Sequence, residues 1–207
     1  MESKKSLNNK LKSLKKALSD KVESHHYDAI AKAIEELPEE KSDPSSEGFP
    51  IPKEIESQSD IAMFSDGACR GNPGPGAWAY VIQDAQGEFI SKNQAVAENT
   101  TNNRMELAGA IEALKEIRNI GFNGKLYLYT DSRYVVDGIE KWVVGWKSRG
   151  WKKADKKAPE NLELWQTLDH LNGELKAKFI WVKGHAGHPQ NELCDQLANE
   201  ALDNAGY

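Results

Sequence analysis

The chain has 207 residues, enough for one full domain with an appendage or for two small domains. Apolar residues make up 39% and charged residues 29% of the sequence, as is usual for a globular protein. No apolar run approaches about 18 residues, so we expect no membrane association through a spanning helix. The two cysteines, Cys69 and Cys194, form no disulfide framework, the N-terminus lacks a secretory apolar core, and no arginine precedes Arg70. These features predict a cytoplasmic protein.

The first 58 residues differ in pattern from the rest. Apolar residues recur at spacings of three and four from Leu7 to Val22 and from Tyr27 to Leu37. This spacing predicts two amphipathic helices, an antiparallel pair with a break around Ser24 and His25. Residues 38–58 hold four prolines with many serines and glutamates, which predicts a linker. We therefore expect a helical extension over 1–37, a linker over 38–58 and the main domain over 59–207.

The extension is also divided by charge. Residues 1–22 carry seven lysines against two acids, whereas residues 23–58 carry three lysines against ten acids. The basic helix could touch a polyanion, the two halves could attract each other, or the pair could dock on the domain or bind a protein partner. The sequence leaves these alternatives open for residues 1–37.

After the linker, strand and helix patterns alternate. Three meandering strands come first, and helices then alternate with strands, which predicts an α/β fold with a mixed sheet covered by helices. The expected strands are 61–65, 78–83, 88–95, 125–130 and 178–182; the expected helices are 102–120, one starting at 132, 161–171 and 191–204.

Four acidic residues occupy positions where the local pattern makes a charge costly. Asp66 and Asp131 follow apolar, strand-like runs, and Glu106 and Asp195 lie early in amphipathic helices. A buried carboxylate has to be paired, protonated or bound to metal. If the first two close adjacent central strands, the helices can bring the other two over the same edge. Two Mg²⁺ ions about 3.5–4 Å apart could then be held for phosphodiester hydrolysis, with Mn²⁺ as an alternative.

A basic segment follows the fourth predicted strand. Residues 141–157 contain seven cations against one anion, Asp155, and three tryptophans are interleaved with them. Basic side chains bind phosphates, and aromatic faces pack on sugars and bases. The alternative is a solvated helix face whose tryptophans belong to the core.

Five segments together resemble type 1 ribonuclease H, especially the bacterial form. They are SDGACRGNPGPGAWAYVI, ENTTNNRMELAGAIEAL, YTDSRYVVDGI, KWVVGWKSRGWKKADKKAPENLELW and WVKGHAGHPQNELCDQLA. They occur in the family's order between about Asp60 and Ala201. The resemblance implies a ribonuclease H-like five-stranded mixed sheet, a monomer, and an endonuclease that hydrolyses the RNA strand of RNA–DNA hybrids and leaves 5′-phosphate and 3′-hydroxyl ends.

The resemblance also assigns roles to single residues. Asp66, Glu106, Asp131 and Asp195 match the metal-binding carboxylates, and His185 matches a loop histidine that assists proton transfer or product departure; we expect His188 to matter less. The expected hybrid-binding residues are Asn72, Asn102 and Asn103 for the minor groove, Thr101 and Asn161 for a DNA phosphate, and Trp142, Trp146, Trp151 and Lys152 in the basic segment. Arg133 stands where bacterial relatives often carry a glutamine that contacts the hybrid.

Two other functions compete with this interpretation. A noncatalytic hybrid-binding module would keep the basic segment but lose carboxylates, and this chain keeps all four. An integrase-like DNA strand transferase of the same fold would not need the tandem Asn102–Asn103 or the tryptophan-rich basic segment.

Overall fold

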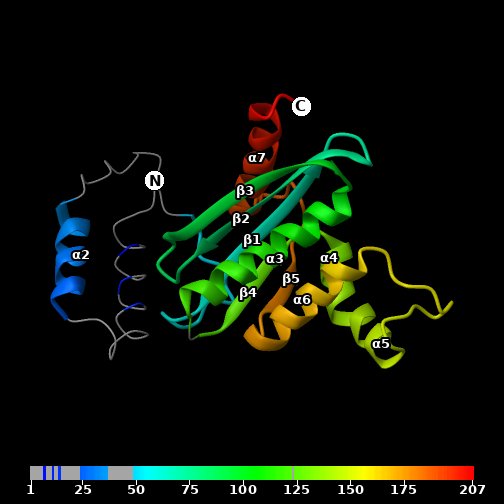
Figure 1. Ribbon diagram of the computed structural model, residues 1–207, viewed down its shortest axis with the longest axis horizontal. Coiled ribbons are helices and arrows are strands. Elements are labelled where there is room, and N and C mark those ends of the chain that lie inside the picture. The colour runs from blue at the N-terminus through cyan, green and yellow to red at the C-terminus, as the bar shows by residue number, and fades with distance from the viewer. Residues whose placement is uncertain (1–6, 8–10, 12–13, 15–23, 37–48, 123) are drawn as a thin grey trace.

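The computed structural model describes residues 7, 11, 14, 24–36, 49–122 and 124–207. A five-stranded sheet forms the centre of the domain, with helices on both of its faces (Figure 1). The strand order is β3-β2-β1-β4-β5. β1 pairs antiparallel with β2 and parallel with β4, so the sheet is mixed, as the sequence predicts.

The strands lie close to their predicted places. They are β1 (Ile61–Cys69), β2 (Gly74–Gln83), β3 (Phe89–Thr100), β4 (Leu126–Thr130) and β5 (Lys178–Trp181). Three predicted boundaries near the glycine-rich loop were wrong: β1 ends later, β2 begins earlier and β3 ends later than the sequence predicts. Gly76 pairs with both Cys69 and Ala97, so this stretch belongs to the sheet although its glycines and prolines are typical of a loop.

The helices of the domain are α3 (Asn102–Ile120), α4 (Arg133–Asp137), the π-helical turn η1 (Gly138–Trp142), α5 (Val143–Ser148), α6 (Leu162–Leu175) and α7 (Pro189–Asn204). The predicted span of α3 is confirmed. It ends because Gly121 adopts a left-handed conformation (φ 71°) and its N–H bonds to the Ile117 carbonyl.

Two apolar clusters hold the layers together. On one face of the sheet, Met63, Ile82 and Leu128 pack with Leu107 and Leu114 of α3 and with the fully buried Trp165 of α6. On the other face, Phe64 and Val81 pack with Leu197 and Leu202 of α7. Alternate residues of β1 therefore point to opposite faces, as the pleat of a strand requires.

The extension is described in part. α2 (Ser24–Glu36) lies apart from the sheet in Figure 1, and Leu11, Tyr27 and Ile34 form a small cluster of their own. The Tyr27 hydroxyl donates to the Leu14 carbonyl at 3.4 Å. Ser24 and His25 are themselves helical and α2 begins at Ser24, so the break predicted around these residues falls at the start of this helix. Most of the predicted first helix, residue 37 and residues 38–48 of the predicted linker lie outside the described residues.

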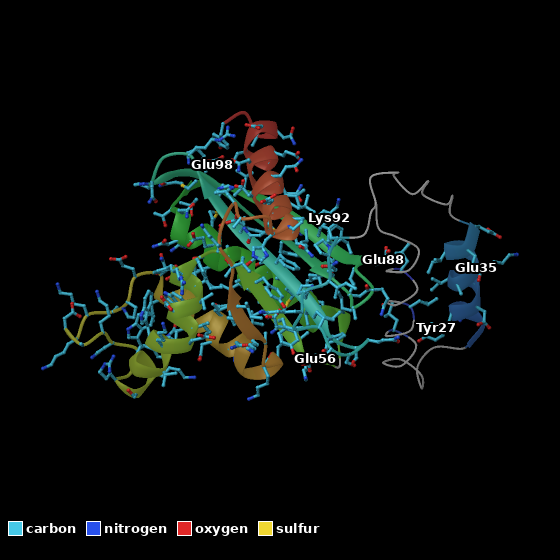
Figure 2. The ribbon with its side chains drawn as sticks, turned by 180° about the vertical axis from the view of Figure 1, so that it is seen from behind. Tyr27, Glu35, Glu56, Glu88, Lys92 and Glu98 are labelled. Carbon is cyan, nitrogen blue, oxygen red and sulfur yellow. The ribbon has the colours of Figure 1, made fainter. Side chains whose placement is uncertain are left out.

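Residues 49–58, also predicted as linker, contact the domain. The Phe49 ring lies 4.8 Å from that of Phe89, and Glu56 pairs with Lys125 (Nζ to Oε2 3.0 Å). Figure 2 shows Glu56 where this segment reaches the sheet. Within the described ranges, the helices are too short or too polar to cross a membrane.

Candidate active site

The strand register brings Asp66 and Asp131 to one edge of the sheet. The parallel pairing of β1 with β4 reaches Phe64 and Tyr129, so each aspartate stands two residues beyond this pair. Asp131 follows the last residue of β4, as predicted. Asp66 does not end its strand, because β1 continues to Cys69 against β2. The sequence thus placed Asp66 and Asp131 on the correct adjacent strands, although the predicted end of β1 was wrong.

Glu106 and Asp195 come to this edge from helices on opposite sides. Glu106 lies in the second turn of α3, whose start packs tightly against β1: a Cβ at Gly67 would lie 2.4 Å from the Glu106 backbone nitrogen. Asp195 lies in α7, where its carboxylate accepts a hydrogen bond from Asn199 at 2.8 Å.

The charges of the four carboxylates act on one another. Burial raises the pKa of Asp66 to about 8, and the charges of Asp131, Asp195 and Glu106 add to this rise. Asp66 is 9% exposed, and its Oδ1 accepts from the Gly67 N–H at 2.7 Å, which works in the opposite direction. Burial, together with the charge of Asp131, also raises the pKa of Glu106. Such crowding is costly without cations.

A chain of hydrogen bonds joins this site to residues predicted to bind substrate. The Asn102 backbone N–H donates to Asn72 Oδ1 at 3.3 Å, and the Asn102 side chain donates to Glu106 Oε1 at 2.8 Å. The other Glu106 oxygen accepts from the Ser132 hydroxyl at 2.5 Å. Asn72 and Asn103 are exposed. The structure therefore links two of the predicted asparagines, Asn72 and Asn102, to one of the predicted carboxylates, Glu106.

His185 lies in an exposed loop that passes directly beside Asp131. A Cβ on the preceding residue, Gly184, would lie 2.4 Å from Asp131 Oδ2, so a larger residue there would displace the Asp131 carboxylate. His185 has a left-handed backbone (φ 49°), and Gly187 does too (φ 79°). This loop leads into α7, with His188 at its N-terminus.

The donor set fits divalent cations. All four side chains offer carboxylate oxygen, the ligand that Mg²⁺ and Mn²⁺ prefer, and their mutual repulsion would be relieved by positive charge. Within the part of the chain that the structure describes, no three His, Cys, Asp or Glu side chains are already gathered around a single point.

Thr101 and Asn161 lie on neighbouring helix starts. Thr101 precedes α3, and Asn161 precedes α6 with a left-handed backbone (φ 56°). Arg104 links the two: its backbone N–H donates to the Thr101 carbonyl, and its guanidinium donates to Asn161 Oδ1 at 3.2 Å. The Asn161 amide donates to the Tyr134 hydroxyl at 3.1 Å. Arg104, which also pairs with Glu163 at 2.7 Å, thus stands between the two residues predicted to bind a DNA phosphate.

In the basic segment, residues 141–157, the two interpretations left open by the sequence, exposed charges for binding and tryptophans that belong to the core, both apply in part. Trp142, Trp146 and the buried Trp165 form an aromatic cluster with ring centroids 5.7–6.4 Å apart. Trp142 is 37% exposed, whereas Trp146 and Trp151 are half-buried against the core. Lys152 and most of the other cations are exposed. The tryptophans are therefore partly structural, and the charges face solvent.

Arg133 is exposed, and its guanidinium carbon lies 3.6 Å from the centroid of the Trp181 ring. The Trp181 indole N–H donates to the Asp131 carbonyl at 2.9 Å. Because the Trp181 ring is hydrogen-bonded to the Asp131 backbone, the Arg133 guanidinium that stacks on it holds a positive charge near Asp131.

Two residues of this region were missed by the sequence analysis. Ser132 both caps α4, accepting from the Val135 N–H at 3.2 Å, and holds Glu106. Its position directly after Asp131 at a helix start was the available signal. Arg104 lies three residues after Thr101 on the same helix turn, a spacing that could have indicated a shared pocket.

Comparison with known proteins identifies the family. The RNase H family model matches residues 58–203. The Ribonuclease H of Agrobacterium fabrum (strain C58) is 48% identical over 143 residues, covering 69% of this chain and 94% of the relative. That of Klebsiella pneumoniae subsp. pneumoniae is 47% identical over 152 residues, covering 71% and 95%.

Solved structures show the same fold. LC9-RNase H1, a type 1 RNase H with the type 2 active-site motif, superposes with a TM-score of 0.63 at 36% identity, covering 72% of this chain and 74% of that one. LC11-RNase H1 in complex with an RNA/DNA hybrid superposes at 0.56 and 27% identity, covering 70% and 98%.

Together with the mixed sheet and the acidic side chains at its edge, these matches define a nuclease of the ribonuclease H-like class. The chain belongs to the ribonuclease H family and is an enzyme of that family.

Proposed function

We propose that this enzyme hydrolyses the RNA strand of RNA–DNA hybrids as an endonuclease, leaving 5′-phosphate and 3′-hydroxyl ends. The observation that carries the proposal is the burial of Asp66, which is 9% exposed, among the charges of three further carboxylates on adjacent elements. A protein does not keep such repulsion for stability alone, and perturbed groups of this kind cluster at functional sites. The relative LC11-RNase H1, solved with a hybrid, supports the choice of substrate.

Asp66, Glu106, Asp131 and Asp195 would hold two divalent cations, Mg²⁺ by preference and Mn²⁺ as a substitute. When bound, such ions activate water and stabilise the departing oxygen of a phosphodiester. Ser132 and Asn102 hold the two oxygens of Glu106, so this carboxylate is oriented before any cation arrives.

His185 would move a proton or assist departure of the product. Its imidazole is exposed, its loop adjoins the Asp131 carboxylate, and histidine exchanges protons near neutral pH. It is therefore an assisting residue, and its loss would slow turnover without stopping it.

Recognition of the hybrid would use both strands. Asn72, Asn102 and Asn103 can donate to and accept from the 2′-hydroxyls and base edges of the RNA minor groove. Arg104, beside Thr101 and Asn161, and the cations of the basic segment would bind DNA phosphates. DNA duplexes lack the hydroxyls, and RNA duplexes lack the flexible deoxyribose strand.

We also propose that the enzyme is a cytoplasmic monomer. Both cysteines are free thiols, which supports a reducing compartment.

One digestion tests the proposal. End-labelled hybrid, DNA duplex and RNA duplex of one sequence are incubated with the enzyme and Mg²⁺. We expect cleavage of the RNA strand of the hybrid alone, at internal positions, with fragments that a polymerase can extend from their 3′ ends. Joining of DNA ends would support the integrase-like alternative, and uncut hybrid would refute hydrolysis.

A further inference from the structure

Residues 49–57, called the strap below, run across the domain before β1 begins. The family model starts at residue 58, after the strap. The strap nevertheless contacts three elements of the domain: Phe49 packs on Phe89 of β3, Glu54 accepts from the Tyr129 hydroxyl of β4 at 2.9 Å, and Pro50 contacts α7. It is therefore part of the folded domain.

Two buried glutamines connect the strap to the domain. The Gln83 amide donates to the Phe49 carbonyl at 3.0 Å, and the Gln190 amide donates to the Pro50 carbonyl and, at 2.9 Å, to Gln83 Oε1. Gln83 is 0% and Gln190 3% exposed. Buried amides need partners, and the strap carbonyls supply one to each glutamine.

Gln190 lies where the loop that carries His185 joins α7. It is the second residue of this helix, which also carries Asp195. On the other side of the strap, Tyr129 lies two residues before Asp131. The strap thus holds the elements that present two carboxylates and the histidine.

A cavity of about 600 Å³ lies between the strap and this loop, lined among others by Pro52, Trp181, Lys183 and His188. The loop is therefore not packed against the strap along its whole length. The cavity leaves space beside the loop, while the hydrogen bonds of Gln190 hold its α7 end.

We propose that the strap is a positioning element of the active site: through Gln190 it fixes the first turn of α7 and thereby sets where the His185 loop rests beside Asp131. The proposal rests on the function proposed above, because it assigns His185 to turnover. The strap touches neither substrate nor metal ligands in this role, and it acts through the loop.

The test uses the full chain with Gln190→Met, which keeps the volume of the side chain and removes its hydrogen bonds. We expect kcat on the hybrid to fall about tenfold, as for other residues that orient active-site groups, with KM changed less than about twofold. Gln196→Met, an exposed glutamine on the same helix, is the matched control and should leave both constants unchanged.

A double-mutant cycle separates positioning from a general structural role. If Gln190 acts through His185, then Gln190→Met should cost less than about twofold in a His185→Ala background. An equal tenfold loss in both backgrounds, or an unchanged kcat for Gln190→Met, would overturn the proposal.

Hydrogen exchange supplies a readout that does not need activity. Amides of residues 183–190 should exchange at least about tenfold faster in Gln190→Met than in the unmodified chain, while those of α3 stay the same. Should that variant not fold, Phe49→Ala, a half-buried change within the strap, should shift exchange and kcat in the same direction. Unaltered exchange of 183–190 would overturn the proposal, whereas failure of the unmodified chain to cut hybrid would count against the proposed function instead.

Discussion

The carboxylate edge and the basic segment carry opposite charge and are built in opposite ways. At the carboxylate edge, few charges are held close together and largely out of water, and Asp66 is so confined that its pKa rises to about 8. In the basic segment, many charges face solvent above a tryptophan cluster. Catalysis requires carboxylates in a fixed geometry, and their burial and mutual repulsion lower the stability of the fold. Binding of a polyanion requires only exposed charges, which cost the fold little stability.

The largest difference should appear when one charge is removed from each region. We expect Asp66→Asn to reduce cleavage at least about a thousandfold, because cation-assisted stabilisation is worth several kcal/mol and about 1.4 kcal/mol is tenfold in rate. Hybrid binding should largely survive. The exposed Asp155→Asn is the control, and retained cleavage by Asp66→Asn, measured on labelled hybrid, would contradict the role of Asp66.

The pH dependence of stability should also distinguish the two regions. The folded-state pKa of Asp66, about 8, exceeds the ordinary value of 3.8, so between these pH values the folded state binds more protons than the unfolded state. Stability of the metal-free protein should therefore fall as pH rises from about 4 to 8, by at most about 1.4 kcal/mol per pH unit.

Urea unfolding in chelator measures this slope. Asp66→Asn should flatten it, and added Mg²⁺ should stabilise the protein more at pH 8 than at pH 6, because cations compete with the protons. An equal slope in the variant would show that Asp66 is not the group responsible.

The tryptophans of the basic segment should separate according to burial. Trp146 packs on the buried Trp165 (5.7 Å between centroids), so Trp146→Ala should cost about 3 kcal/mol of unfolding free energy. Trp142 is the more exposed ring, and Trp142→Ala should mainly weaken hybrid binding, by about 1 kcal/mol. Thermal unfolding and binding titration on both variants check this, and a reversed order would contradict the packing.

Single lysines should have smaller effects. Lys152→Ala should lower the slope of log K against log salt by about one and leave kcat unchanged, as expected for one phosphate contact. Lys92→Ala, an exposed lysine on β3 (Figure 2), serves as the matched control and should leave the slope unaltered. Equal slopes for Lys152→Ala and the unmodified chain would remove Lys152 from the interface.

The smallest effect concerns the extension. If the lysines of residues 1–22 touch hybrid phosphates, exchanging them for glutamine in the full chain should lower the salt slope slightly and leave kcat unaltered. Coincident slopes would favour the alternatives, docking on the domain or binding of a protein partner.

The sequence predicts features that depend on local pattern. α3 was placed correctly because its apolar spacing is regular and Gly121 ends it. The strand start at Gly74 was missed because glycine and proline are typical of loops, and only pairing with Thr100 reveals the strand.

Tertiary contacts account for what the sequence could not predict. The four acids were found from their positions after strands and in helices, but the hydrogen bond from Ser132 to Glu106 joins separate elements. The Gln83–Gln190 pair joins residues 107 positions apart, and neither glutamine lies in a pattern that indicates burial. The division of the tryptophans between core and surface depends on Trp165, which comes from another helix.

The central claim is that Asp66, Glu106, Asp131 and Asp195 together hold two divalent cations. Anomalous diffraction from crystals of the protein grown with hybrid and Mn²⁺ tests it most directly. We expect two manganese peaks bounded by these four side chains. Crystals that contain bound hybrid but no manganese between these carboxylates would contradict the claim.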